Sequence, residues 1–337
     1  MIKDILHHLA ERGDLSAPQL HDFTCAILDG LCSPAQTGAF LMALAQRPIT
    51  SDYIVAAVTA IRARAIKLTL FPEAIDCCGT GGDHSQSLNI STATGFVAAA
   101  CGVKIAKHGN RAATSRSGAA DVLEALGVNL DLSLFQEEQA LDHIGFSFLM
   151  APNHHPALKN LAPIRRELGF RTLFNLLGPL ANPAGTQRQL IGVYDRALCD
   201  PVAQALRDLG SSAAIIVHGA DGLDEISLCG ETYYSMLQNG TITSGVWSPA
   251  DFGLGLIAPD SITGGDASFN ARALMGLLEG TPSAYSDIVL ANTAATLLLA
   301  GIAPTLPEGV AMGRDALSSG KALRVFTDYR DYTTTIL

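Results

Sequence analysis

The chain has 337 residues and a formal net charge of −10, from 22 basic and 32 acidic side chains. An acidic chain without a basic stretch argues against nucleic acid and anionic membranes as partners. Hydrophobic residues make up 48% of the chain, which is enough for the core of one large domain or of two domains. Residues 1–8 have the pattern of an amphipathic helix and not that of a signal peptide.

The cysteines and the most apolar segment fit a protein that stays in the cytoplasm. The seven cysteines form no CxxC pair and follow no secretory signal, which predicts reduced thiols. Cys77 and Cys78 are expected to be buried as small apolar side chains. The stretch 288–304 contains Asn292 and Thr293 and is too short to span a bilayer, so we predict a buried helix there.

Helical periodicity fills residues 1–66, where we predict about four helices. Ser16, Ser33 and Ser51 each precede an apolar-periodic run, as N-cap residues do. From about residue 73, short apolar runs alternate with helical segments, which is the pattern of βαβ units and a mostly parallel sheet. The predicted strands are 74–78, 103–106, 146–149, 190–194 and 214–217, and the predicted helices are 90–101, 117–126, 156–168 and 199–209.

Later segments complete the predicted architecture. Asn239-Gly240 between apolar runs predicts a type I′ hairpin, and residues 267–325 return to helix. The fold class is therefore α/β, with a small all-helical N-terminal domain over 1–72 and a larger α/β domain over 73–337. The helical segment at about 156–178 is expected to join the N-terminal domain.

A glycine loop follows the first predicted strand. The run Gly79-Thr80-Gly81-Gly82-Asp83 precedes Asn89-Ile90-Ser91-Thr92, which reads as the start of a helix. Glycines let main-chain N–H groups approach a phosphate closely, and the helix dipole favours its charge. The run matches neither GxGxxG nor the Walker pattern, and a plain strand-to-helix turn is the alternative interpretation.

A second polar cluster ends the strand 103–106. It contains Lys107, His108 and Arg111 and continues through Arg116 into a helix. Ligands of open α/β sheets bind outside the carboxyl ends of the strands, where both loops lie. Two such loops side by side suit a multiply phosphorylated ligand better than a single phosphate.

The third cluster, Asp221-Gly222-Leu223-Asp224-Glu225, follows the strand 214–217. Adjacent carboxylates repel each other unless a cation binds or one is protonated, and hard oxygen ligands suit Mg²⁺ shared with substrate phosphates. A solvated acidic turn is the alternative. Arg165, Arg166 and Arg171 lie in or after the helix 156–168 and face either an anion or solvent.

The histidines divide by their surroundings. His108 is the most interesting, because it lies in the second cluster. His84 beside the glycine loop is expected to be solvated, and His154-His155 is spaced too closely for a metal pair on a helix.

Four motifs in this order resemble anthranilate phosphoribosyltransferases: GTGGD…NIST, KHGNR…SRSGAADVLEALG, PIRRELGFRTLFNLLGPLANPA and GLDEIS. The resemblance covers residues 74–227 and implies the fold of nucleoside phosphorylases and their phosphoribosyltransferase relatives. It implies transfer of 5-phosphoribosyl from phosphoribosyl diphosphate (PRPP) to the amine of anthranilate, a step of tryptophan biosynthesis. It further implies a homodimer, to which Leu41, Met42, Leu44, Ile54 and Val55 could contribute.

The resemblance also implies roles for individual residues. Asn110, Arg165 and Gly79 would contact anthranilate, and Ser91, Asp224 and Glu225 would hold two Mg²⁺ ions per subunit. His108 and Lys107 are the candidate catalytic residues, although a water could equally take the amine proton. The residues implied around PRPP are Gly79, Gly82, Asp83, Ser87, Asn89, Ile90, Ser91, Thr92, Lys107, His108, Gly109, Asn110, Arg111, Ala112, Ala113, Thr114, Ser115 and Ala119.

The chain departs from the family pattern at two places. Thr114-Ser115 replaces Ser-Ser and keeps a hydroxyl, whereas Ala119 replaces a serine and loses a donor to phosphate, which predicts weaker PRPP contact. Two other functions stay open at this stage: a nucleoside phosphorylase, and a non-enzymatic relative that binds nucleic acid. The acidic charge disfavours the second.

Overall fold

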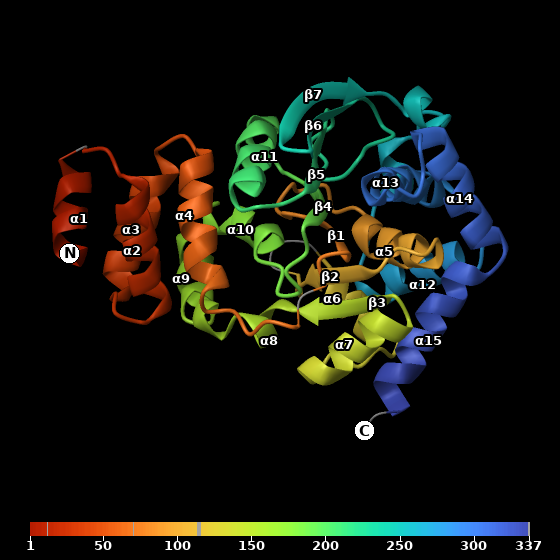
Figure 1. Cartoon of the computed structure of the whole chain (residues 1–337), viewed down its shortest axis with the longest axis horizontal. Helices are drawn as coiled ribbons and strands as arrows, with labels where there is room; N and C mark the ends of the chain where they lie inside the picture. The colour runs from red at the N-terminus through yellow and green to blue at the C-terminus, as the bar shows by residue number, and fades with distance from the viewer. Residues whose placement is uncertain (12, 70, 113–115, 336–337) are drawn as a thin grey trace.

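The structure is a computed structural model, which describes residues 1–11, 13–69, 71–112 and 116–335. Figure 1 shows an N-terminal group of helices beside a twisted sheet, with further helices on the far side of that sheet. Among the described residues, no helix combines the length and the hydropathy needed to cross a membrane.

Four helices form the N-terminal part, as the sequence predicted. They are α1 (Ile2–Ala10), α2 (Ala17–Leu28), α3 (Pro34–Ala45) and α4 (Ser51–Arg62). Ser16 and Ser33 cap α2 and α3 by accepting the N–H of Gln19 and Gln36. The prediction for Ser51 is wrong, because Thr50 caps α4 by accepting from Tyr53.

The central sheet has seven strands in the order β3-β2-β1-β4-β5-β6-β7. The first five strands in this order, β3, β2, β1, β4 and β5, are parallel to one another. The last two, β6 and β7, form an antiparallel hairpin at one edge. Asn239 and Gly240 both have positive φ, which confirms the type I′ turn. The bounds are β1 (Ile75–Gly79), β2 (Ile105–Gly109), β3 (Phe146–Met150), β4 (Arg188–Gly192), β5 (Ala213–Gly219), β6 (Thr232–Gln238) and β7 (Thr241–Trp247).

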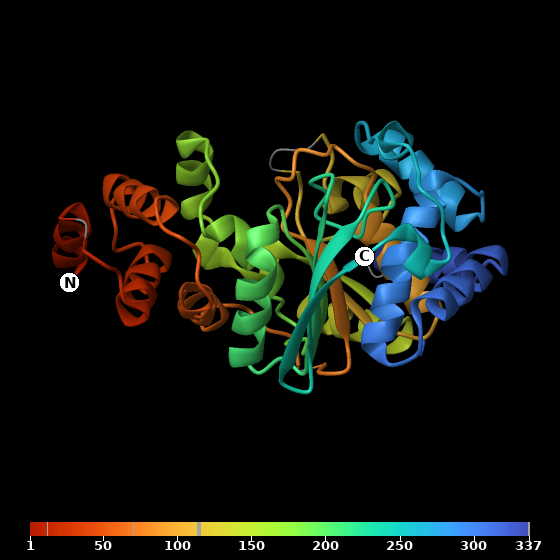
Figure 2. The ribbon, with the colours of Figure 1, turned by 90° about the horizontal axis from the view of Figure 1, so that it is seen from above.

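Further helices cover both faces of the sheet (Figure 2). The predicted helix 156–168 is instead two short pieces, η1 (Pro156–Leu158) and α9 (Leu161–Leu168). The short helix α8 (Ala151–His154) precedes them, and α10 (Phe174–Leu180) follows. The others are α5 (Ile90–Ala100), α6 (Ala119–Ala125), α7 (Leu134–His143), α11 (Cys199–Asp208), α12 (Ala267–Leu278), α13 (Ala284–Ala300), α14 (Leu306–Ser318) and α15 (Lys321–Thr335), with short turns η2 (Arg196–Leu198), η3 (Pro249–Phe252) and η4 (Pro259–Ile262).

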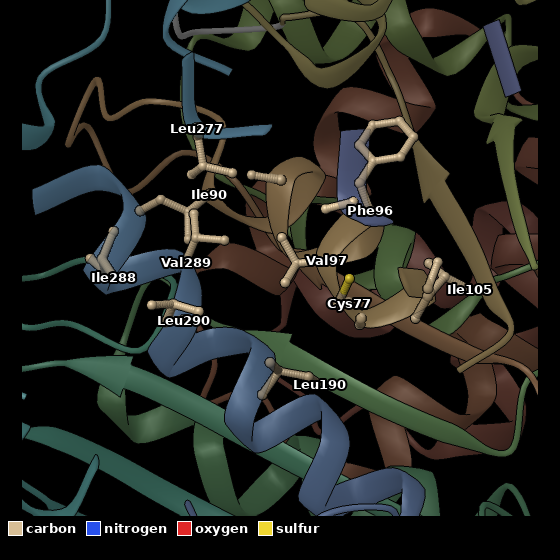
Figure 3. Close-up of a cluster of buried hydrophobic side chains, with 14 of the residues drawn as sticks. Cys77, Ile90, Phe96, Val97, Ile105, Leu190, Leu277, Ile288, Val289 and Leu290 are labelled. Atoms are coloured by element: carbon tan, nitrogen blue, oxygen red, sulfur yellow. The ribbon is translucent and has the colours of Figure 1, made fainter. Parts of the chain in front are cut away.

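Alternate side chains of the buried strands point into two different cores. Ile75, Cys77 and Leu190 enter a core formed with α5, α12 and α13, part of which Figure 3 shows. Cys78 and Ile191 point the other way, into a core shared with α2, α4, α10 and α11. Because β1 and β4 are buried on both faces, neighbouring residues of one strand serve opposite sides of the sheet.

The second core includes three side chains that we expected at a dimer contact. Leu41, Leu44 and Ile54 are fully or almost fully buried inside it. That expectation is therefore wrong for these three residues, since a bundle of short helices buries its largest apolar side chains among its own members. Of the proposed contact residues, Met42 remains exposed.

The segment between α4 and β1 is fixed by a buried polar network. The N–H of Ile66 donates to the carbonyl of His154 at 2.8 Å, and Nδ1 of His154 donates back to the carbonyl of Ile66 at 2.9 Å. The other ring nitrogen of His154 lies 3.1 Å from Glu137, and both side chains are buried. This network links the helical part of the chain to the sheet through α7 and α8.

Candidate active site

Four neighbouring parallel strands end in glycine at the same edge of the sheet. They end at Gly109 of β2, Gly79 of β1, Gly192 of β4 and Gly219 of β5. The loop after β5 returns across these strand ends. A Cβ atom on Gly192 would lie 1.6 Å from the main-chain oxygen of Asp224, and one on Gly79 would lie 2.3 Å from Oδ2 of Asp224. Only glycine permits this approach, so the strand ends determine where the acidic pair lies.

Asp224 and Glu225 are each tied to one end of the segment that contains the glycine loop. The N–H of Gly81 donates to Oδ2 of Asp224 at 2.6 Å, and the N–H of Ser91 donates to Oε1 of Glu225 at 3.1 Å. The N–H of Asp224 donates to Oδ2 of Asp83 at 3.4 Å. The structure therefore brings together the first and third clusters of the sequence.

The acidic pair is poorly neutralised. Asp224 and Glu225 are each 8% exposed, and burial raises the pKa of Glu225 to about 7. Burial, together with the charges of Asp83 and Glu225, raises the pKa of Asp224 well above its usual range. A hard divalent cation would relieve this repulsion, and the carboxylates with the hydroxyl of Ser91 offer the oxygen donors that it prefers.

The protein supplies only part of a coordination shell at this place. Within the described ranges, no three His, Cys, Asp or Glu side chains are grouped closely enough to hold a metal ion together. A cation at Asp224 and Glu225 would therefore take further ligands from water or from substrate oxygens, as Mg²⁺ commonly does.

Lys107 lies inside the sheet and not in a loop. The sequence placed the strand at 103–106, but β2 spans Ile105–Gly109 and includes both Lys107 and His108. Lys107 is 2% exposed, and its Nζ donates to the carbonyl of Cys77 at 2.8 Å and to Oγ of Ser91 at 3.1 Å. These two acceptors allow a lysine to remain in a buried strand. Its charge acts from behind Ser91 and lowers the pKa of Glu225.

His108 points to the opposite face of the sheet and packs against His155, with ring centroids 5.1 Å apart. Burial lowers the pKa of His108 to about 3 and that of His155 to about 4, so both rings are neutral near pH 7. Nδ1 of His108 donates to the carbonyl of Gly178 at 3.1 Å, which leaves Nε2 as an acceptor. Nε2 is buried and has no hydrogen-bond partner among the described residues. His108 can therefore accept a hydrogen bond from a ligand but is a weak base.

Two residues of this face escaped the sequence analysis. Asp76 is fully buried and accepts from the N–H of His108 at 3.3 Å and from Nδ2 of Asn182 at 2.9 Å, and burial raises its pKa to about 6. His155 stands beside His108, although the sequence suggested only a loop or helix start for it. Asp76 could have been found from the sequence, because a charged residue inside an apolar strand is unusual. No sequence signal indicated that His155 lies beside His108.

Asp121 of α6 closes the second loop. The N–H groups of Ala112 and Gly118 donate to its Oδ2 at 2.9 and 2.8 Å. Arg111 is paired with Glu124 through both terminal nitrogens and lies 3.5 Å from Asp121, so its charge is already compensated. Gly109 ends β2, and Asn110 follows it as the first residue of this loop. Ala119 begins α6, and the predicted residues Ala113, Thr114 and Ser115 lie outside the described residues.

The segment between the glycine loop and α5 is held by the C-terminal helices. Oδ1 of Asn89 accepts from Asn270 at 2.9 Å, and its main-chain oxygen accepts from the hydroxyl of Tyr285 at 3.0 Å. Ser87 pairs with Thr263 in an isolated bridge. Ile90 and Thr92 are buried in the first turn of α5, while Gly82 and Asp83 stay partly exposed in the loop.

The three arginines near α9 occupy different environments. Arg165 is partly buried, its Nε has no hydrogen-bond partner in the part of the chain that the structure describes, and burial lowers its pKa. Arg166 is exposed. Arg171 donates to the carbonyl of Gly82 and stacks on Tyr194 at 4.6 Å, so it contacts the glycine loop directly. His84 is exposed, as expected.

Comparison with known proteins gives the same two-part division. Residues 3–65 match the model of the helical bundle domain of a glycosyl transferase family, and residues 72–323 match the model of its α/β domain. Anthranilate phosphoribosyltransferases of Rhodopseudomonas palustris (strain TIE-1) and Bradyrhizobium sp. (strain ORS 278) are 50% and 49% identical to this chain, over 95% of each protein. The chain belongs to the anthranilate phosphoribosyltransferase family.

Solved structures of the family share the fold. The anthranilate phosphoribosyltransferase of Thermus thermophilus is 37% identical and aligns with a TM-score of 0.91 over 98% of this chain and 99% of its own. The Saccharomyces cerevisiae protein in complex with PRPP and Mg is 29% identical and has a TM-score of 0.91, over 99% of this chain and 98% of its own. A further yeast structure is a complex with 4-fluoroanthranilate, with 27% identity, a TM-score of 0.89 and 99% coverage of both chains.

The lowered pKa of His155 predicts a pH effect on stability. The pKa is 6.5 in the unfolded chain and about 4 in the fold, so the unfolded state binds more protons as the pH falls below 6.5. The free energy of unfolding should therefore fall between pH 7.5 and pH 5, and His155→Gln should lose about 1–2 kcal/mol less over this range than the wild type. Urea denaturation at the two pH values measures the difference, with the exposed His143→Gln as the control. A His155→Gln slope equal to that of the wild type would contradict the assignment.

Proposed function

We propose that this protein transfers the 5-phosphoribosyl group of PRPP to the amine of anthranilate, giving N-(5-phosphoribosyl)anthranilate and diphosphate in tryptophan biosynthesis. The observation that carries the proposal is the buried pair Asp224–Glu225, hydrogen-bonded to the glycine loop and to the start of α5. Buried carboxylates whose charge is only partly offset, beside a glycine loop, suit a diphosphate substrate bound with a divalent cation.

The donor site would lie on the α5 side of the sheet edge. The main-chain N–H groups of the glycine loop and of the first turn of α5 would receive the phosphates of PRPP. Lys107 adds positive charge behind Ser91. Asp121 keeps the second loop closed at its ends, so that loop can form the other wall of the site. We propose that the residues implied around PRPP by the family resemblance make these contacts.

The cation proposed here is Mg²⁺, on Asp224, Glu225 and Ser91, with two ions per subunit. A yeast relative was solved with PRPP and Mg, and the oxygen donors of this chain suit the same ion. Bound there, Mg²⁺ would neutralise the charge that develops on the departing diphosphate. The chain's own contribution is to hold the two carboxylates on the glycine loop and on the start of α5, with their charge offset only in part by Lys107.

The acceptor would bind on the other side of the sheet, toward the helical part of the chain. Arg165 would pair with the anthranilate carboxylate, with Asn110 and Gly79 nearby. As the C1–oxygen bond of PRPP breaks, its electron pair leaves with diphosphate and the amine nitrogen bonds to C1. The extra amine proton is then acidic, so Nε2 of the neutral His108, or a water, can accept it without being a strong base.

The other functions considered from the sequence are less favoured. The net charge of −10 gives no electrostatic footprint for nucleic acid. A nucleoside phosphorylase shares the fold, but relatives that are named anthranilate phosphoribosyltransferase match 95% of this chain at 49–50% identity. Free thiols at all seven cysteines support a cytoplasmic location for the proposed activity.

Anthranilate fluorescence tests the function. The wild type should consume anthranilate only when PRPP and Mg²⁺ are both present, and excess EDTA should abolish the loss. Glu225→Gln should lower turnover by on the order of 10²-fold or more, because a group that helps neutralise the transition-state charge is lost. Phosphate with a nucleoside serves as the alternative substrate pair. Turnover of that pair without consumption of anthranilate, or full activity of Glu225→Gln, would overturn the proposal.

Arg165 and Arg166 form a matched pair for testing the acceptor site. Arg165→Ala should raise the KM for anthranilate by about 10- to 100-fold and leave that for PRPP almost unchanged, the scale expected for a lost charged hydrogen bond. Arg166→Ala should change neither constant much, since Arg166 is exposed. Steady-state kinetics with each substrate varied in turn decides the matter. A larger anthranilate effect from Arg166→Ala would show that the assignment is wrong.

We also propose that residues 1–72 with segment 156–178 act as one domain that closes against residues 73–337 when both substrates bind. The helical part would join two copies into a homodimer, with exposed Leu31 and Met42 as candidate contacts. Light scattering at micromolar concentration should give twice the monomer mass, and Met42→Asp should lower it if this face is used. A monomeric wild type would refute the dimer.

A further inference from the structure

Asn292 is a fully buried polar residue in the middle of α13. The same helix carries Val289 and Leu290, which Figure 3 shows in the hydrophobic core. Its carboxamide is fully engaged. Oδ1 accepts from the N–H of Ile226 at 3.0 Å, and Nδ2 donates to the carbonyls of Ile226 at 3.0 Å and Ile288 at 2.9 Å. A polar group in such a helix costs free energy unless its hydrogen bonds are made, and here both N–H donors and the carbonyl oxygen have partners.

The partner of Asn292 is the residue that follows Glu225. Ile226 is buried and belongs to no strand, so its main-chain N–H and C=O have no ladder partner. Asn292 pairs with both groups as a neighbouring strand would. The main chain is therefore held on one side of the acidic pair by α13 and on the other by the close approach of Asp224 to Gly192 and Gly79.

The helix that carries Asn292 is itself fixed to the donor side of the site. α13 packs against α5, whose first turn donates the N–H of Ser91 to Glu225. Tyr285, at the start of α13, donates to the carbonyl of Asn89 just before α5. The acidic pair thus contacts α5, and α5 packs against α13. Asn292 connects α13 back to the loop that carries the acidic pair.

We infer that Asn292 is a positioning residue that holds Asp224 and Glu225 together for the divalent cation, an inference that rests on the proposed function. The two carboxylates repel each other, and a loop free to shift would carry them away from the N–H groups of Gly81 and Ser91 that they accept from. Two hydrogen bonds to the adjacent peptide unit oppose that shift. Asn292 acts through the main chain and touches neither substrate nor cation.

Asn292→Leu tests the inference, because leucine is of similar size and removes every hydrogen bond to Ile226. The Mg²⁺ concentration for half-maximal activity should rise by on the order of tenfold or more, as for other groups that orient metal ligands, with the anthranilate KM almost unchanged. Mn²⁺ binding in the presence of PRPP, followed by the spin-resonance signal of free Mn²⁺, should weaken in parallel and needs no turnover.

Thr293→Val is the matched control. Thr293 is the next residue of α13, equally buried, and its hydroxyl has no hydrogen-bond partner among the residues that the structure describes. This variant should bind Mn²⁺ as the wild type does. In a Glu225→Gln background, Asn292→Leu should add less than about a twofold further change, because both substitutions disturb the same cation site.

Each outcome decides the inference. If Asn292→Leu is insoluble, Asn292→Ala removes the same bonds without adding a branched side chain and replaces it. Equal Mn²⁺ binding in folded Asn292→Leu and Thr293→Val, or additive effects with Glu225→Gln, would overturn the positioning role. A wild type that binds Mn²⁺ with PRPP but does not consume anthranilate would contradict the proposed function and leave the role of Asn292 measurable.

Discussion

The close passage of the Asp224 main chain over Gly192 and Gly79 is the constraint on which the site depends. A side chain at either glycine would overlap with Asp224, so the loop after β5 can cross the neighbouring strand ends only because they lack Cβ atoms. The crossing carries Asp224 to the glycine loop and Glu225 to the start of α5. Burial then leaves two carboxylates whose charge is offset only in part, by Lys107 behind Ser91, and a divalent cation with a diphosphate would use this property.

The alternation of side chains along β2 separates the two halves of the proposed reaction. Lys107 points toward Ser91 and the donor side, while the next residue, His108, points toward α10 and His155. One strand therefore supplies a positive charge to one face and a neutral acceptor to the other. Asp76, on the neighbouring strand, receives the N–H of His108 and fixes the relative position of these strands near their ends.

The sequence predicted the parts of the structure that depend on local signals. Short apolar runs that alternate with helical segments identified the five parallel strands, and Asn239-Gly240 identified the hairpin. Errors arose where distant residues decide the outcome. Lys107 looked like a loop residue because its acceptors lie on β1 and α5, and Asn292 looked incidental because its partner is 66 residues away. Leu41 and Ile54 looked available for a dimer because periodicity cannot distinguish an outer face from the inside of a bundle.

The account is tested most directly by the anomalous diffraction of Mn²⁺ in crystals grown with PRPP. We expect an anomalous peak in contact with the carboxylates of Asp224 and Glu225, with the diphosphate of PRPP beside it and over the glycine loop. The two carboxylates should remain next to the glycine ends of β1 and β4. PRPP bound with its diphosphate away from this loop, or Mn²⁺ bound with PRPP but not to the acidic pair, would contradict the account.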